Sequence, residues 1–206
     1  AWRLPCSAHP DTPALSALSS ILGGGRSARF YEKFHDRLGL VYSIEVHSNQ
    51  SETDEGAFTI SMDVDRAQRD KVRDLVLQEL RNLAEEDFTE DLKRVCKQTR
   101  VSRLRRRSSA SGVASEMGAD WFGSRNLNLS SEWQEAIERV TTEDLHRVCS
   151  TWLSSPNVTE VSLDPPGSNA GDEERASASA GTALSEHVLG NGMKVVIRED
   201  HRLPLA

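Results

Sequence analysis

The sequence predicts an α+β fold, in which a mostly antiparallel sheet carries helices on one face. Two stretches rich in β-branched and aromatic residues, 41–48 and 57–64, are separated by a polar loop that contains a glycine, a pattern typical of a β-hairpin. Amphipathic segments with helical spacing follow, and their apolar stripes need a sheet face to bury them. Residues 1–8 and 158–164 complete the expected sheet.

The first elements follow from turn residues and capping residues. Residues 1–8 contain a proline, so we expect this strand at an edge of the sheet. A helix should begin at Asp11 or Thr12 and end at the three glycines 23–25.

A second helix is expected from about residue 27 to 37. Three apolar residues, Phe30, Phe34 and Leu38, recur every four positions, which places them on one face of an α-helix. Gly39 should end this helix before the strand 41–48 begins.

The second half of the chain is expected to be mainly helical. An apolar stripe follows the hairpin, and its members are Val72, Leu75, Val76, Leu80 and Leu83. The stretch from 89 to about 122 also reads as helix, although Gly112 and Gly118 loosen its second half. Two shorter helices follow before the closing strand.

Composition limits the class of protein. The chain has 206 residues, a net charge of −7, 37% hydrophobic and 28% charged residues, which fits a polar globular protein. No apolar run approaches the roughly 20 residues of a membrane span, so we expect no membrane partner. The chain begins at Ala1 and not at methionine, so we expect a piece cut from a longer protein.

The domain organisation follows from a change of composition after Pro165. Residues 1–165 are expected to form one domain. Residues 166–183 are small and polar, and indicate a flexible linker. Residues 184–206 contain a strand, a Gly-Asn-Gly turn and a second strand, and then stop. We interpret them as the truncated start of a second domain.

The sequence offers no zinc site of its own. A zinc helix needs two histidines about one turn apart, as in H-x-x-E-H or H-E-x-x-H, and none of the six histidines has such a partner. The stretch 183–187, "ALSEH", has alanine where the first ligand should be. We therefore predict no metal ligands and no catalytic residues within this chain.

An arginine cluster invites a nucleic-acid interpretation. Arg103 and the run 105–107 concentrate positive charge, as a nucleic-acid patch would. The chain is acidic overall and no aromatic residues alternate with these arginines. We therefore expect a solvated helix face or salt bridges to an acidic neighbour, and no nucleic-acid partner.

The order of these elements and two motifs resemble a known family. The motifs are "LGGGRSARFYEKF" at 22–34 and "RLGLVYSI" at 37–44. Residues 1–165 resemble the C-terminal half-domain of M16 (insulinase/pitrilysin-like) zinc metallopeptidases. The tail 189–206, "LGNGMKVVIREDHRLPLA", resembles the start of an N-terminal M16 half-domain.

The resemblance implies an M16/LuxS-like half-domain that closes with others around a peptide. The implied partners are a peptide substrate and the other M16 half-domains of the same parent chain. The family's zinc motif belongs to an N-terminal half-domain, so the cofactor implied for the parent protein is zinc bound outside this fragment. The resemblance leaves the compartment open between bacterial cytoplasm, periplasm and mitochondrial matrix.

The resemblance also points to two substrate-binding residues, Tyr42 and His35. In the family, an arginine seven residues before a tyrosine helps to hold the scissile carbonyl, where donors stabilise developing negative charge. Here the tyrosine is Tyr42, but His35 stands in the arginine's place. Arg37 lies about 200° around an α-helix from His35, so it should face elsewhere. In the alternative interpretation, Tyr42 packs in or near the sheet and His35 lies on the chamber wall.

The predicted function is therefore the non-zinc half of an M16-like metalloendopeptidase, with a degenerate carbonyl-binding pair. It would form the wall of a peptide-binding chamber. The alternative is a catalytically inactive M16 relative with a structural or chaperone-like assembly role. An H-x-x-E-H motif before Ala1 or after Ala206 of the parent chain would decide between them.

Overall fold

The computed structural model describes residues 1–50, 55–153, 158–164, 184–188 and 194–198. The chain divides into two compact units, Ala1–Val161 and Ser162–Ala206. The first unit contains a three-stranded sheet and the described helices, and the second contains two paired antiparallel strands.

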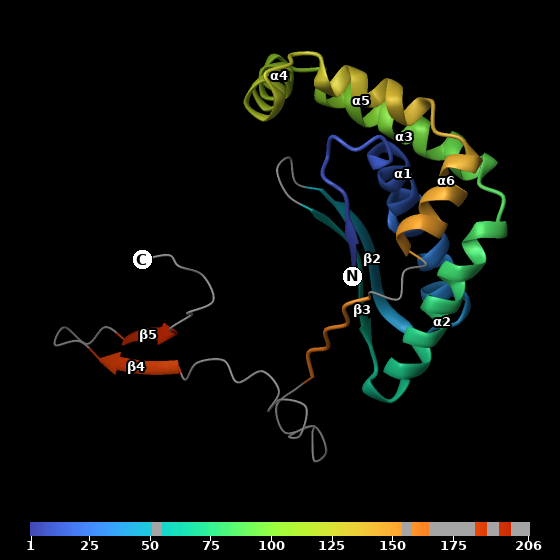
Figure 1. Ribbon diagram of the computed structural model, residues 1–206, viewed down its shortest axis with the longest axis vertical. Helices are drawn as coiled ribbons and strands as arrows, with labels where there is room; N and C mark the ends of the chain where they lie inside the picture. The colour runs from blue at the N-terminus through green and yellow to red at the C-terminus, as the bar shows by residue number, and fades with distance from the viewer. Residues whose placement is uncertain (51–54, 154–157, 165–183, 189–193, 199–206) are drawn as a thin grey trace. The chain divides into compact units, whose positions relative to one another are not determined.

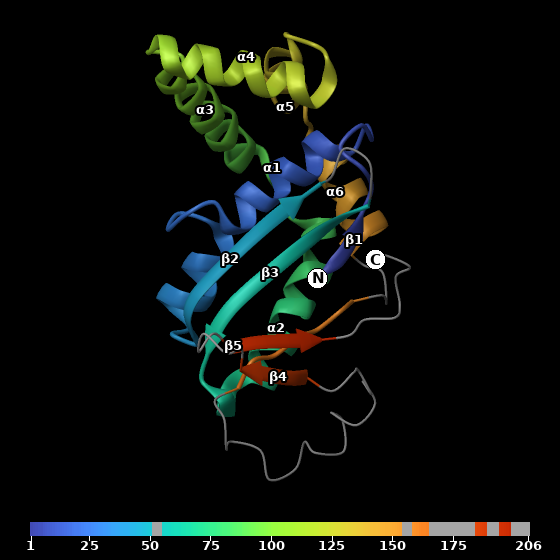
Figure 2. The ribbon, with the colours of Figure 1, turned by 90° about the vertical axis from the view of Figure 1, so that its left-hand side faces the viewer.

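The first unit is built on an antiparallel sheet with the strand order β1–β3–β2. Its strands are β1 (Trp2–Leu4), β2 (Val41–Asn49) and β3 (Gly56–Val64). The described helices of this unit lie on one side of the sheet (Figures 1 and 2). The predicted α+β fold and the predicted edge position of the first strand are confirmed.

The prediction of a strand at 158–164 is wrong, because this segment forms no strand. This segment touches the sheet through two backbone hydrogen bonds, from the Thr159 N–H to the Ala1 carbonyl (2.9 Å) and from the Ala1 amine to the Thr159 carbonyl (2.8 Å). Its neighbour β1 is three residues long and offers few ladder partners. Val158 and Val161 are exposed, so the segment has no buried face to hold it as a strand.

Helix α1 (Thr12–Gly23) lies directly against β2. The α1 side chains Leu15, Leu18 and Leu22 are fully buried. At its last residue, a Cβ added to Gly23 would lie 2.5 Å from the backbone nitrogen of Val46. The glycine that ends the helix, as the sequence predicts, therefore also allows the helix and the strand to approach each other closely.

The helix expected at 27–37 forms instead as a shorter π-helix, η1 (Tyr31–Arg37). A π-helix has hydrogen bonds from residue i+5 to residue i, as seen between the Leu38 N–H and the Lys33 carbonyl (3.0 Å). Gly39 ends it in the left-handed region with φ of +59°, as its position in the sequence predicts.

The wider turn of η1 changes which side chains share a face. Phe30 and Phe34 are buried, and their rings meet edge to face with centroids 5.4 Å apart. Leu38 was expected beside them but is 47% exposed. The prediction assumed α-helical spacing, and π-helical winding rotates Leu38 away from the core.

The helical half of the unit begins as the sequence predicts. Helix α2 (Arg69–Asn82) and the short 3₁₀ helix η3 (Leu83–Glu85) carry the apolar stripe. Four of its members are buried and Leu75 is half-buried; the buried ones are Val72, Val76, Leu80 and Leu83.

The expected long helix from 89 to 122 is two helices, α3 (Thr89–Arg106) and α4 (Ala110–Ser124). The break comes before Gly112, because the Ser109 hydroxyl accepts a hydrogen bond from the Gly112 N–H (3.1 Å) and caps α4. The remaining helices are η2 (Arg66–Gln68), α5 (Leu129–Glu138), α6 (Thr142–Val148) and the π-helical η4 (Cys149–Leu153). None of the described helices has the length and apolar character needed to cross a membrane.

Asp11 precedes α1 but does not cap it with its side chain. The buried carboxylate accepts hydrogen bonds from Trp152 Nε1 (2.9 Å) and from the Arg147 guanidinium. Asp11 therefore ties the start of α1 to α6 and η4. Burial by itself raises the pKa of Asp11, but the hydrogen bonds from Trp152 and Arg147 outweigh it, so that this pKa lies below its usual value.

Asp11 should make stability fall in acid. Its folded-state pKa is depressed, so its stabilisation is present above the unfolded pKa of about 4 and is lost as the pH falls through the lower folded value. We expect Asp11→Asn to be less stable than the parent at pH 7 and to lose less stability between pH 5 and about 2.5. Urea unfolding at pH 7 and at several pH values between 5 and about 2.5 measures both. Asp70→Asn, an exposed control, should keep the parent's slope; a parental slope for Asp11→Asn would contradict the prediction.

The second unit contains strands β4 (Leu184–Val188) and β5 (Lys194–Arg198), which pair antiparallel. The two strands of the predicted hairpin are confirmed. Its turn at 189–193 and the predicted linker at 166–183 lie outside the described residues. The assignment of 1–165 and 184–206 to two different half-domains stays a prediction.

Candidate functional site

The face of the sheet opposite the helices carries polar side chains. Val41, Ile44 and Val46 of β2 are buried toward the helices. Residues directly opposite each other on neighbouring strands share a face. The group that we call the polar sheet face consists of Tyr42, Ser43, Glu45, His47, Thr59, Ser61 and Asp63.

A β-bulge places Tyr42 and Ser43 side by side at one end of the polar sheet face. The strand register shifts between Val41 and Ser43, so that Tyr42 is the extra residue. Tyr42 is 69% exposed, and its hydroxyl donates to Asp65 Oδ1 at 3.1 Å. The Ser43 hydroxyl donates to Asp63 Oδ2 at 2.5 Å. Each hydroxyl thus has its own carboxylate partner.

The carboxylate of Asp65 affects the protonation of the Tyr42 hydroxyl. The hydrogen bond to Asp65, and then the charge of Asp65, raise the pKa of Tyr42 above its usual value. The phenol therefore keeps its proton and directs it to Asp65. To donate that proton to a substrate carbonyl, Tyr42 would have to give up this hydrogen bond, because a phenol has one donor.

His35 makes its contacts within η1. Its ring stacks on Tyr31, with centroids 4.4 Å apart and an interplanar angle of 19°. Its Nδ1 lies 2.6 Å from Asp36 Oδ1, and its Nε2 lies 3.5 Å from the Tyr31 hydroxyl. The imidazole is therefore held by its neighbours in the helix, while Tyr42 is held by Asp65.

Arg37 does not take the place of the missing arginine. Its guanidinium is exposed and pairs with Glu32, five residues earlier in η1. This spacing matches the i to i+5 geometry of a π-helix. The sequence reasoning missed the two carboxylates of this region, Asp63 and Asp65. The acidic alternation in "MDVD" at 62–65 is the signal that could have revealed them once the hairpin register was known.

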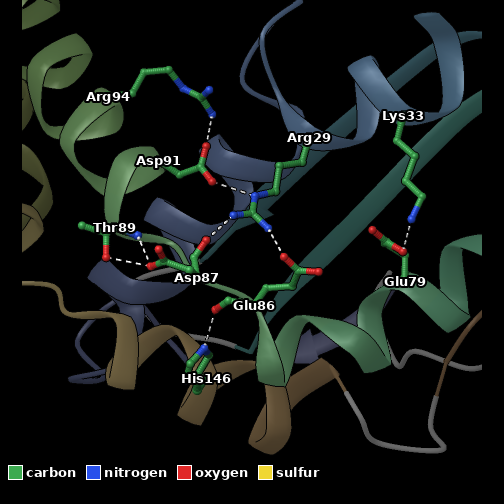
Figure 3. Close-up of polar contacts among 9 residues, drawn as sticks. All are labelled: Arg29, Lys33, Glu79, Glu86, Asp87, Thr89, Asp91, Arg94 and His146. Carbon is green, nitrogen blue, oxygen red and sulfur yellow. Dashed lines mark hydrogen bonds and ion pairs between the residues drawn. The ribbon is translucent and has the colours of Figure 1, made fainter. Parts of the chain in front are cut away.

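An ionic network anchors the segment that leads into η1 (Figure 3). Arg29 donates from Nε to Asp91 Oδ2 (2.6 Å), from Nη1 to Glu86 Oε2 (3.1 Å) and from Nη2 to the Asp87 carbonyl. Its guanidinium also lies over the Phe88 ring, 4.7 Å from the centroid. One side chain thereby joins the α1–η1 connection to the start of α3.

Neighbouring contacts extend this network to α2 and α6. Arg94 binds the second oxygen of Asp91 at 2.6 Å, and Lys33 of η1 pairs with Glu79 of α2. His146 Nε2 lies 2.8 Å from the Glu86 carbonyl (Figure 3). The network fixes η1, and with it His35 and the entry to β2, against the helices. Its role is structural support for the candidate site.

The described part of the chain does not fit zinc. Among residues 1–50, 55–153 and 158–164, no three histidine, cysteine or acidic side chains come together to hold a metal ion. The four histidines in these ranges have separate neighbours: His9 lies against Trp152, His35 against Tyr31, His47 near Glu45 and His146 near Phe88.

The arginine cluster forms salt bridges, as one of its two predicted interpretations requires. Arg103 of α3 binds Glu116 of α4 at 3.0 Å, and Arg107, the residue after α3, binds the same carboxylate at 2.6 Å. Arg105 and Arg106 are exposed. The positive charge is thus partly neutralised within the molecule.

Comparisons with known proteins agree with this architecture. Residues 1–99 match the family described as the peptidase M16 inactive domain. A curated relative, an "uncharacterized zinc protease" of Rickettsia felis, is 23% identical over 138 residues, which are 67% of this chain and 33% of that protein.

Three solved structures share the fold. A protease from Helicobacter pylori aligns with a TM-score of 0.66 and 23% identity, over 74% of this chain and 37% of that one. The peptidase M16 inactive domain from Pseudomonas fluorescens aligns with a TM-score of 0.61 and 18% identity, over 72% of this chain and 37% of that one. An inactive peptidase domain from Bordetella parapertussis aligns with a TM-score of 0.64 and 17% identity, over 80% of this chain and 91% of that one. This chain therefore spans about a third of the Rickettsia felis and Helicobacter pylori proteins, and 91% of the Bordetella parapertussis domain.

Proposed function

This chain belongs to the M16 peptidase family through residues 1–99, which match its inactive domain, and we propose that it forms one wall of a peptide-binding chamber in a zinc endopeptidase. In this proposal, zinc and the groups that activate water lie in another part of the parent chain. The relative named a zinc protease supports the reaction class.

The observation that carries the proposal is the polar sheet face. It is a surface of extended strands on the side away from the described helices, and its side chains include hydroxyl, imidazole and carboxylate groups. Such groups can bind the N–H and C=O groups of an unfolded peptide. In the described sheet β2 is an edge strand, and extended peptides can bind at sheet edges by adding a strand.

Three contacts favour a binding wall over a direct role in catalysis. The Tyr42 hydroxyl is engaged by Asp65, and His35 is engaged by Tyr31 and Asp36. An imidazole also lacks the permanent charge and the rigid fork of donors that an arginine would offer to a carbonyl. The pair of residues 35 and 42 therefore binds or lines the chamber without polarising the scissile bond.

Restoring the arginine tests this proposal. We expect His35→Arg in the full-length protein to change the cleavage rate of an unstructured peptide by less than about twofold. A working carbonyl donor is worth about 10²- to 10³-fold. The double variant His35→Arg/Asp65→Ala also removes the acceptor that holds the Tyr42 hydroxyl, and should likewise stay near the parental rate.

The matched control is His47→Arg. It adds a guanidinium to β2, the strand that carries Tyr42, but at a position away from Tyr42. A gain above about tenfold for either residue-35 variant, without a gain for His47→Arg, would show that this site can hold the carbonyl. That result would contradict a purely binding role.

The hydrogen bond between Tyr42 and Asp65 also favours a second candidate, a relative that binds peptides without cleaving them. Metal analysis and a cleavage assay of the full-length protein separate the two. Bound zinc with cleavage supports the peptidase. Peptide binding with neither zinc nor cleavage supports the structural or chaperone-like relative.

A further inference from the structure

A polar cleft opens among the helices of the first unit. Its volume is about 700 Å³, within the range of about 300–1,000 Å³ that is usual for ligand sites. Thr12, Ser16 and Ser20 line it from α1, at the four-residue spacing that keeps them on one helix face. The rest of the lining comes mainly from α3, α5 and the end of β2. The cleft is thus surrounded by hydroxyl, amide and charged groups where helices usually meet through apolar side chains.

A buried carboxylate from α4 lies in this lining. Glu116 is 5% exposed, and its Oε1 accepts hydrogen bonds from Arg103 Nη2 (3.0 Å) and Arg107 Nη1 (2.6 Å). Arg103 Nη2 also donates to the Ser131 hydroxyl at 2.7 Å. The hydrogen bond from Arg103 lowers the pKa of Glu116 against the effect of burial. Glu116 is therefore a charged carboxylate.

Four polar atoms of the cleft lining are buried without a hydrogen-bond partner. They are Glu116 Oε2, Arg103 Nε, Gln50 Nε2 and the Ser48 hydroxyl. Buried polar atoms nearly always have partners, so four unpaired ones around a single cleft indicate that it takes a polar occupant. The unpaired set consists of a charged acceptor, a guanidinium donor, an amide donor and a hydroxyl.

The charges of the cleft define the chemistry of that occupant. The charged residues of the lining are Arg103, Arg106 and Glu116, which leaves an excess of positive charge. Guanidinium groups bind carboxylates through their paired N–H donors. Glu116 Oε2 requires a donor in the same ligand. A carboxylate next to an N–H group meets both requirements, and a peptide has this pair at its C-terminal residue.

We propose that this cleft binds the free C-terminus of a peptide. The terminal carboxylate would bind Arg106 and Arg103 Nε, and the last amide N–H would donate to Glu116 Oε2. The lining residues Thr12, Ser16 and Ser20 would contact the preceding peptide groups. The cleft lies on the helical side of the sheet, so this proposal does not depend on the polar sheet face.

The experiment compares two forms of one probe on the full-length protein. Isothermal titration calorimetry is performed with N-acetyl-trialanine carrying a free C-terminal carboxylate and with the same peptide as its C-terminal amide. We expect the acid to bind at least tenfold more tightly than the amide. Equal affinities, or no binding of either form, would overturn the proposal.

Variants assign any binding to the cleft. Arg106→Gln should abolish the preference for the acid, and Arg105→Gln, the neighbouring exposed arginine outside the lining, should retain it. Glu116→Gln should weaken both peptide forms, provided that its circular dichroism matches the parent. A preserved preference in Arg106→Gln, or its loss in Arg105→Gln, would place the peptide elsewhere and refute this site.

Discussion

Replacing Phe34 by alanine is expected to lower the free energy of unfolding by about 3–5 kcal/mol, the usual cost of removing a buried aromatic side chain. Phe34 is fully buried at the centre of η1, and its ring meets that of Phe30 at 5.4 Å. Phe34 belongs to the main hydrophobic core together with Leu18 and Val46, so alanine leaves a cavity among buried side chains.

Urea unfolding followed by circular dichroism measures the loss. Phe122→Ala is the matched control, because the Phe122 side chain is 83% exposed on α4. Its effect should stay within about 0.5 kcal/mol, as is usual for surface positions. A Phe34 variant as stable as the Phe122 variant would mean that η1 does not pack as described.

The second large effect is expected for Arg29→Ala, which should destabilise the protein by about 2–3 kcal/mol. The arginine side chain is 27% exposed and donates to Asp91, Glu86 and the Asp87 carbonyl (Figure 3). Its loss takes this partner from Glu86 and leaves Asp91 with Arg94 alone, and a group left unpaired costs more than a hydrogen bond contributes.

Lysine should not restore the stability lost at residue 29. A lysine ammonium is a compact point charge, whereas this site uses a planar fork that also lies over Phe88. We expect Arg29→Lys to recover less than half of the loss. Arg26→Ala, three residues earlier and exposed, is the matched control and should be close to neutral. If the Arg26 and Arg29 alanine variants were equally stable, the network would not support the fold.

These contacts explain what the motif at 22–34 does in this molecule. Gly23 permits the close approach of α1 to β2, Arg29 anchors the connection, and Phe30 and Phe34 fill the core. The residues that carry much of the resemblance are therefore structural. The candidate binding residues come after the motif, on β2, or just beyond its end in the case of His35.

The sequence by itself determined the elements that rest on local patterns. The hairpin strands fell close to 41–48 and 57–64, α1 ended at the glycines, and the stripe of α2 was buried. These features depend on residue type and on spacing within a few positions, which a sequence displays directly.

The tertiary structure decided the features that depend on distant neighbours. It gave η1 a π-helical winding, joined Tyr42 to Asp65, 23 residues away, and placed Glu116 among arginines of the preceding helix at a polar cleft. It also left 158–164 outside the sheet. Each outcome depends on which groups meet after folding, and that is set by the burial and hydrogen bonding of the whole unit and not by the period of any one segment.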